Sequence, residues 1–189
     1  MGEIIVAITG ASGAIYGIRL IEELSKMGKR MRIIVTESAK LTLKHECGYD
    51  VEQISSIDGV TLEDNSDIAA KSASGSAKID AMVIVPCSGT TLGKLASGIG
   101  DNLVTRSAIV SMKERRKLII VPRETPLATP HIENMLKLST WDTVILPASP
   151  GFYNIPQSID DLVDFIVSRI LDQLNLENEV SKRWTGEEL

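Results

Sequence analysis

Short apolar runs alternate with amphipathic stretches along this 189-residue chain, and this alternation limits the fold more than any other feature. Each run is bounded by Gly, Ser, Thr or Pro, as is typical of buried parallel strands, and the stretches between runs have helical spacing. The pattern is typical of βαβ units. It predicts an α/β protein with a mainly parallel sheet in a three-layer sandwich of the flavodoxin-like or Rossmann-like kind.

The predicted strands and helices follow one another in turn. Strands are predicted over 4–8, 32–35, 81–85, 118–121 and 143–146, and helices over 14–28, 38–46, 92–96, 103–112, 130–138 and 158–174. The polar segment 48–80 shows neither periodicity and is predicted to be an irregular connection. We expect residues 1–189 to form a single α/β domain with a C-terminal helix and a polar tail.

Composition disfavours several functional classes. The formal net charge of −5 disfavours non-specific nucleic-acid binding, which needs a basic surface. No apolar run reaches the roughly 18–20 residues that span a bilayer, and the N-terminus lacks signal-peptide features, so we expect no membrane contact. Cys47, Cys87, His45 and His131 do not have metal-ligand spacing, so we expect reduced thiols, a cytoplasmic location and no metal.

Small and polar residues gather after every predicted strand. In an open α/β sheet, ligands bind outside the carboxyl ends of the strands, so these segments are the candidate site. They are residues 9–13, 36–38, 86–91, 122–126 and 147–153. Five such strand ends together indicate a binding site rather than ordinary loops.

The loop Gly10–Gly13 follows the first strand and precedes a helix. Glycines permit a tight turn, and the helix N-terminus offers N–H donors and a positive dipole end to a phosphate. The GxxG spacing lacks the dinucleotide fingerprint and a Walker lysine, so a mononucleotide phosphate such as that of a flavin suits it better. A purely structural tight turn is the alternative.

A second anion site is predicted near Arg123, where a guanidinium at the sheet edge can bind phosphate in a paired manner. Arg106 and Lys113 lie seven residues apart on one helical face and are predicted to point toward one anion. Arg169 flanks the apolar stripe of the last helix, either as a ligand or as a side chain that snorkels to solvent. Ser88, with Thr90 and Thr91, is either a helix cap or a ligand contact.

Taken together, the strand-end motifs resemble those of the UbiX-type flavin prenyltransferases. The resemblance rests on the segments 9–14 (TGASGA), 16–17 (YG), 73–76 (ASGS), 86–88 (PCS), 113–116 (KERR), 122–126 (PRETP), 151–153 (GFY) and 156–158 (PQS). These motifs extend over nearly the whole chain in the same order.

The resemblance implies bound FMN, a homo-oligomer that is a dodecamer, and a prenyl transfer. In that reaction the dimethylallyl group of dimethylallyl monophosphate is joined to N5 and C6 of reduced FMN, and phosphate leaves. The product, prenylated FMN, passes to a UbiD-type decarboxylase. No metal takes part.

The same resemblance implies roles for individual residues. FMN contacts are implied for Gly10, Ala11, Ser12, Thr36, Ser88, Gly89, Thr90, Thr91 and Arg123. Contacts to the prenyl phosphate are implied for Lys113, Arg123, Tyr153 and Arg169. Roles in catalysis are implied for Ser12, Glu46, Lys113, Glu124, Arg106 and Trp184.

Elementary chemistry agrees with these roles. Breaking an allylic C–O bond leaves a cation and a phosphate, and Arg and Lys stabilise the charge that develops on the leaving group. Tyr153 can donate to the same phosphate. Ring closure requires removal of the proton at C6, for which Glu124 or the released phosphate is a candidate base.

The sequence departs from the family pattern at three places. Ile68 stands where many members carry a Trp, the loop 89–91 lacks a lysine that some members have, and Thr36 replaces a frequent Ser.

Two alternative functions stay open: a flavin-dependent decarboxylase acting directly on a carboxylate, and a non-catalytic flavin carrier. The first needs an early catalytic His and an Asn-containing loop, and neither His45 nor the 88–91 loop matches that pattern.

Overall fold

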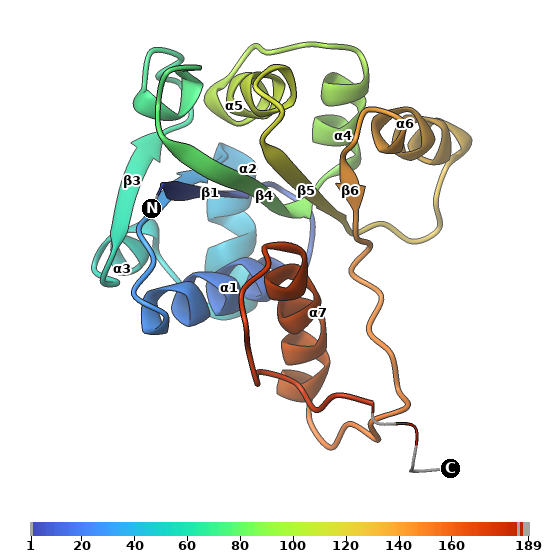
Figure 1. The fold of residues 1–189 in the computed structure, drawn as a ribbon. Helices are drawn as coiled ribbons and strands as arrows, with labels where there is room; N and C mark the ends of the chain where they lie inside the picture. Colours follow the sequence, from blue (N-terminus) through green and yellow to red (C-terminus); the bar gives the residue numbers. More distant parts are fainter. Residues whose placement is uncertain (1, 185, 187–189) are drawn as a thin grey trace.

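The computed structural model describes residues 2–184 and 186, and strands and helices alternate through it (Figure 1). The strands are β1 (Glu3–Ile8), β2 (Met31–Val35), β3 (Val60–Asp64), β4 (Ile79–Cys87), β5 (Lys117–Pro122) and β6 (Val144–Ile145). The helices are α1 (Ala14–Lys26), α2 (Glu37–Thr42), α3 (Val51–Ser55), α4 (Gly89–Ala96), α5 (Leu103–Lys113), α6 (Thr129–Ser139) and α7 (Ile159–Gln173). A π-helical turn, Leu43–Cys47, follows α2, and a 3-10 turn, Lys71–Ala73, precedes β4.

The six strands form one parallel sheet in the order β3-β2-β1-β4-β5-β6, which confirms the predicted fold class. The chain builds outward from β1 to β3, then returns past β1 and builds the other half from β4 to β6. The order therefore reverses between β1 and β4. Open α/β sheets bind ligands at such a reversal point, outside the carboxyl ends of the two strands, and this region is here called the crevice.

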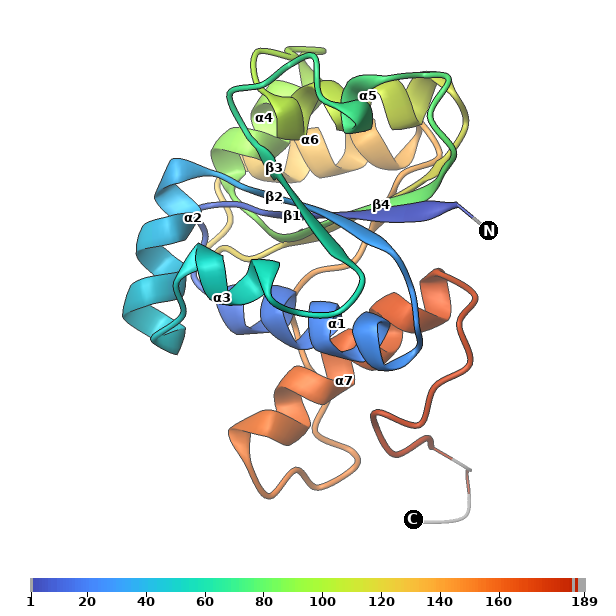
Figure 2. The same ribbon diagram turned by 90° about the vertical axis from the view of Figure 1, so that its left-hand side faces the viewer.

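Helices cover both faces of the sheet (Figure 2). Alternate residues of β1 enter different cores: Val6 packs with the α1 and α7 side, and Ala7 with the α4, α5 and α6 side. All six residues of β1 are buried, as expected for a central parallel strand covered on both faces. Burial of each large aliphatic side chain contributes about 1.5–3 kcal/mol, so the two cores hold the strand ends in place.

Strand β3 corrects the expectation of an irregular connection over 48–80. Its sequence has no apolar run because β3 pairs only with β2, and three of its five residues are exposed. Edge strands tolerate polar side chains because only one side is paired. An ion pair ties the edge to the sheet: Arg32 Nη1 of β2 lies 2.6 Å from Glu63 Oε1 of β3.

Two further boundaries differ from the sequence prediction. The helix predicted over 38–46 is an α-helix that ends at Thr42 and continues as the π-helical turn, and the strand predicted over 143–146 is reduced to β6. Beyond β6, residues 149–157, here called the arm, extend away from the sheet to the start of α7 (Figure 1). The tail, residues 176–184, returns to the arm, where Asn154 Nδ2 donates to the Lys182 carbonyl at 2.5 Å.

None of the helices in the described part of the chain is both long enough and apolar enough to cross a membrane.

Candidate active site

Buried hydrogen bonds join the ends of β1 and β4. The hydroxyl of Thr9, which is 1% exposed, donates to the Pro86 carbonyl at 2.8 Å and accepts the N–H of Ser88 at 2.8 Å. The loop after β1 and the loop after β4 are thereby held side by side at the reversal point of the sheet. The structure thus brings together two of the strand ends that the sequence singles out.

Glu46 binds the N-terminus of α1. Its Oε2 accepts the N–H of Gly13 at 2.8 Å and that of Ala14 at 3.1 Å. Gly13 has φ of 102°, which favours glycine, and it turns the chain so that both amides face the carboxylate. Glu46 reaches this position from the π-helical turn, an irregularity often found at functional sites.

The surroundings of Glu46 favour its ionised form. Burial raises the pKa of this carboxyl, but hydrogen bonds from the Ser12 hydroxyl and the Gly13 and Ala14 amides, with the charge of Arg123, lower it more. The net result is a pKa below the ordinary value, so Glu46 is an anion at neutral pH. The protein's own carboxylate therefore takes two of the α1 amides that the sequence suggests for a cofactor phosphate.

The loop after β2 lies against the loop after β1. Thr36 accepts the N–H of Ala39 at 3.2 Å and so caps α2, and its hydroxyl lies 3.2 Å from the Ser38 hydroxyl. A Cβ on Gly10 would lie 2.2 Å from Ser38 Oγ, so the close approach of this loop requires glycine at position 10. Ser38 is missing from the sequence-based site list, although it belongs to the polar strand end 36–38.

Ser88 caps α4, as one of the two sequence interpretations predicts. Its hydroxyl accepts the N–H of Thr91 at 3.2 Å and donates to Thr91 Oγ1 at 3.0 Å. Within the described residues, the N–H groups of Gly89 and Thr90 have no hydrogen-bond partner. The cap and a ligand contact are therefore compatible, because the cap leaves two amides at this helix start for a ligand.

Arg123 connects the end of β5 to the loop after β1. Its Nε donates to the Ser12 carbonyl at 3.0 Å, so Ser12, Glu46 and Arg123 meet although they come from three separate segments. Glu124 is exposed beside Arg123, and its Oε1 accepts the N–H of Thr125 at 3.2 Å. The carboxyl ends of the strands thus bring together the guanidinium of Arg123, the carboxylates of Glu46 and Glu124, and free backbone N–H groups.

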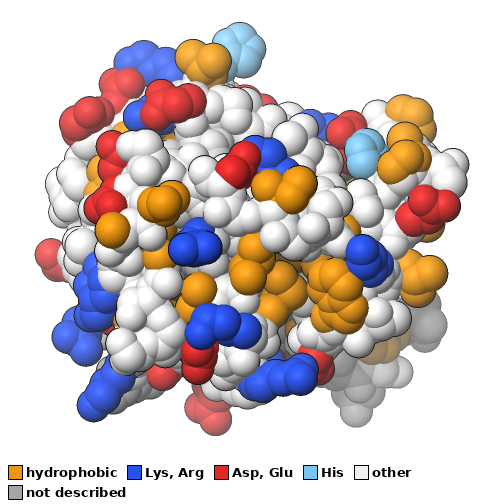
Figure 3. Space-filling model, turned by 90° about the horizontal axis from the view of Figure 1, so that it is seen from above, with side chains coloured by type: hydrophobic (Ala, Val, Ile, Leu, Met, Phe, Trp, Pro, Cys, Tyr) orange, Lys and Arg blue, Asp and Glu red, His pale blue; other side chains and the backbone are white. Residues whose placement is uncertain are grey.

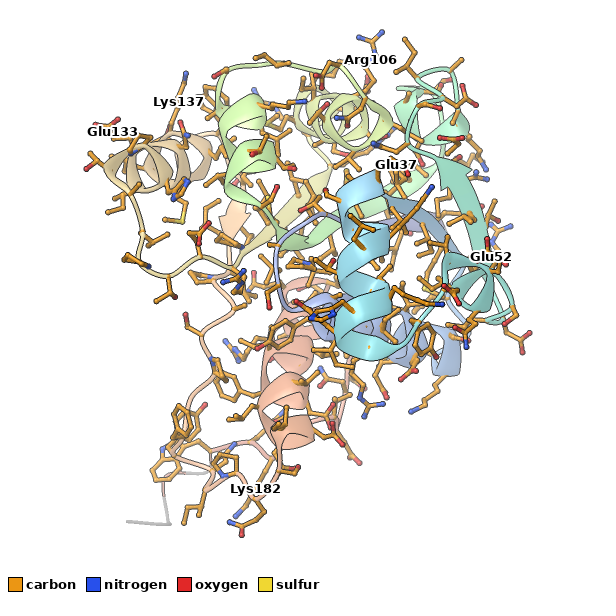
Figure 4. All side chains as sticks on the ribbon, turned by 180° about the vertical axis from the view of Figure 1, so that it is seen from behind. Glu37, Glu52, Arg106, Glu133, Lys137 and Lys182 are labelled. Carbon is orange, nitrogen blue, oxygen red and sulfur yellow. The ribbon has the colours of Figure 1, made fainter. Side chains whose placement is uncertain are left out.

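Lys113 lies at the amino ends of the strands, on the side of the sheet opposite to the crevice. It pairs with Glu114, and its Nζ lies 2.9 Å from the position of a Cβ on Gly75, which precedes β4. The six residues of β5, roughly 17 Å of strand, separate Lys113 from Arg123. Arg106 is exposed and projects outward from α5 (Figure 4). Within one chain, these two side chains do not converge with Arg123.

Tyr153, Arg169 and Trp184 form a third group between the arm, α7 and the tail. The Tyr153 ring makes edge-to-face contacts with Phe165 at 5.8 Å and with Trp184 at 5.9 Å between centroids. All four residues line a pocket of about 230 Å³. The site residues implied by the resemblance therefore occupy three places on one chain.

Charges in this pocket suit an anion. Its lining includes three cationic side chains, those of Arg169, Lys182 and Arg183, and one carboxylate, that of Asp172. The hydrogen bond from Arg183 is the largest of the influences that lower the pKa of Asp172, with Arg169 adding to them. Figure 4 shows Lys182 at the opposite end of the molecule from Arg106.

Ile68, in the loop after β3, is 50% exposed. No group of three or more His, Cys, Asp or Glu side chains within the described residues is arranged to hold a metal ion.

A family model and a sequence relative both relate this chain to flavoproteins. The family model called Flavoprotein matches residues 2–171. The chain is 48% identical over 181 residues to the flavin prenyltransferase UbiX of Thermoplasma acidophilum, a match that covers 96% of this chain and 99% of the relative.

Two solved structures superpose closely on this fold. AnUbiX (PadA1) in complex with FMN and dimethylallyl pyrophosphate gives a TM-score of 0.96 at 38% identity and 99% coverage of both chains. A dodecameric FMN-dependent UbiX-like decarboxylase from Escherichia coli O157:H7 gives 0.94 at 40% identity, with 97% of this chain and 100% of that chain covered. The chain therefore belongs to the flavoprotein family and, within it, to the UbiX-type flavin prenyltransferases.

Proposed function

We propose that this protein is a flavin prenyltransferase that joins the dimethylallyl group of dimethylallyl monophosphate to N5 and C6 of reduced FMN and releases phosphate. When bound, reduced FMN supplies the nucleophilic atoms for both new bonds. The observation that supports the proposal most strongly is the meeting of Ser12, Glu46 and Arg123 at the reversal point of the sheet. The nearly full-length match to UbiX-type enzymes gives that crevice its chemistry.

The crevice fits a phosphate-bearing flavin. Backbone N–H groups of Gly10, Ser12, Gly89 and Thr90 have no partner among the described residues, and the guanidinium of Arg123 lies beside them. Donors of this kind at helix starts bind anions. The hydroxyls of Thr36 and Ser38, in the loop after β2, would be available to hold the polar ribityl chain. We propose that the whole chain acts as one flavin-binding unit.

The ionised Glu46 has a distinct task in this proposal. It accepts hydrogen bonds from Ser12 and from the start of α1, and it thereby fixes the loop that would hold the flavin. Glu124 is exposed at the same edge and is the base that we propose for the proton released on ring closure. Arg123 stabilises negative charge on the phosphate.

We propose that copies of the chain share each site, because Lys113 and the Tyr153–Arg169 pocket lie far from Arg123 within one chain. Lys113 borders an open apolar hollow of about 630 Å³ that includes Ile109 and Met112. Hydrophobic side chains gather among Lys and Arg on this face (Figure 3). The E. coli relative is dodecameric, and we propose the same assembly, a cytoplasmic location and a UbiD-type decarboxylase as recipient of the product.

The test is the mass of the flavin after turnover. Purified protein is mixed without oxygen with reduced FMN and dimethylallyl monophosphate, and the flavin is analysed by mass spectrometry, with the donor omitted as a control. We expect a flavin heavier by one prenyl group and an equal amount of phosphate. An unchanged flavin would refute the proposal, and release of carbon dioxide from an aromatic carboxylate by this protein alone would favour the decarboxylase.

A further inference from the structure

His131 connects two helix starts at the edge of the crevice. It is the third residue of α6, and its Nδ1 accepts the N–H of Ala128 at 3.3 Å. This hydrogen bond caps α6 and fixes the orientation of the imidazole ring. With Nδ1 held in this way, the Nε2 side of the ring faces Gly89 at the start of α4.

The imidazole of His131 occupies the space beside Gly89. A Cβ on Gly89 would lie 2.5 Å from His131 Nε2, 3.1 Å from its Cδ2 and 3.2 Å from its Cε1, so all three nearest atoms belong to this one ring. Gly89 is not among the residues with positive φ, so its backbone conformation does not require glycine. The close approach of His131 is thus the structural reason for glycine at this position.

A second glycine of α4 shows how specific this contact is. Gly93 lies one turn after Gly89 and also faces α6, but a Cβ there would meet only Asn134 Nδ2, at an ordinary 3.6 Å. The tight contact between the two helices is therefore concentrated at His131 and Gly89, the point nearest the crevice.

We propose that His131 is a positioning residue for the flavin: by packing against Gly89 it holds the first amides of α4 toward the crevice. The proposal rests on the proposed use of the 88–91 segment in FMN binding. His131 is joined to Arg123 and Glu124 by the short segment 125–128, so its packing also sets the distance between the loops after β4 and β5. Neither the sequence motifs nor the resemblance gives His131 a role.

A double-mutant cycle tests the contact, with the affinity for oxidised FMN alone as the readout. Gly89→Ala places a methyl group against the imidazole, and we expect the dissociation constant for FMN to rise about tenfold. In the double variant Gly89→Ala/His131→Ala the space is restored, so the dissociation constant returns to within about threefold of that of His131→Ala. Gly93→Ala is the matched control and leaves FMN affinity unchanged.

His131→Gln separates capping from positioning. Gln at the third helical position can still accept the Ala128 N–H, so the cap is kept while the imidazole contact with Gly89 is lost. We expect this variant to melt at the wild-type temperature while its KM for FMN rises several-fold and its kcat stays within about threefold. A melting temperature that falls without any change in FMN affinity would show a merely structural role and overturn the proposal.

The remaining outcomes are equally decisive. If Gly89→Ala weakens FMN binding and the double variant does not recover it, the two residues are not coupled and the proposal fails, while the proposed function stands. Wild-type protein that binds no FMN would refute the proposed function and this inference together.

Discussion

Replacement of Glu3 by Gln tests how far a buried ion-pair network holds the sheet together. Glu3 begins β1 and is 7% exposed, and its Oε2 lies 2.8 Å from Arg32 Nε and 2.6 Å from Lys71 Nζ. Arg32 also pairs with Glu63, so one guanidinium joins β1, β2 and β3. The pKa of Glu3 is lowered to about 2, mainly by the hydrogen bond from Arg32. Burial alone would raise this pKa, and the hydrogen bond from Lys71 helps to lower it.

The magnitude follows from that pKa. A lowering from an ordinary 4.5 to about 2 corresponds, at about 1.4 kcal/mol per pKa unit, to a contribution of about 3 kcal/mol at neutral pH. Because the folded pKa is the lower one, this stability is complete above about pH 4.5 and is lost as the pH falls toward 2. Glu3→Gln keeps the size of the side chain but has no such titration.

We therefore expect the free energy of unfolding of Glu3→Gln to be about 3 kcal/mol below that of the wild type at pH 7, with the two values converging near pH 2. Urea unfolding followed by circular dichroism at a series of pH values measures this difference. The matched control is Glu37→Gln, because the Glu37–Lys40 pair is exposed to solvent and its loss should leave the free energy of unfolding nearly unchanged. A Glu3→Gln effect that is under about 1 kcal/mol, or that does not change with pH, would refute the reasoning.

Three further predictions concern the crevice. Thr9→Val removes the hydroxyl that bridges Pro86 and Ser88, and we expect a loss of about 2 kcal/mol in urea unfolding together with weaker FMN binding; a loss under about 0.5 kcal/mol would contradict this. Glu46→Gln removes an anion from a helix start, so we expect about 0.5–1 kcal/mol less stability at pH 7. Because the folded pKa of Glu46 lies below the ordinary value of 4.5, that difference should fade as the pH falls below 4.5 and through the folded pKa, and a difference that grows on acidification would disprove it. Glu124→Gln should keep FMN affinity within about threefold and reduce turnover at least about a hundredfold in the mass assay, whereas unchanged turnover would remove Glu124 from the mechanism.

Sequence reasoning succeeds where local pattern and burial agree. Central strands such as β1 are apolar throughout because both faces are covered, so their positions and the loops that follow them are visible in the sequence. It fails at β3, where an edge position removes the need for apolar residues. The role of Arg32 in holding this edge strand cannot be predicted from the sequence, because its partners Glu3 and Glu63 are distant along the chain.

The site residues divide in the same way. Ser12 and Arg123 follow predicted strands, so the rule for open sheets places both at one edge. Glu46 could be named only through the family resemblance, because its contact with the start of α1 depends on a π-helical turn. Helical spacing places Arg106 and Lys113 on one face of α5, but it does not show that Lys113 lies at the far edge of the sheet from Arg123.

The sequence by itself therefore determined the α/β class, the parallel strands and the polar strand ends, because these depend on local periodicity and on small residues at fixed places. Only the tertiary structure decided which anion occupies the start of α1, why position 89 is a glycine and how the other implied residues divide among three places. These outcomes depend on contacts between residues that are remote in the chain. The physical reason is that packing, not periodicity, sets the distance between one loop and another.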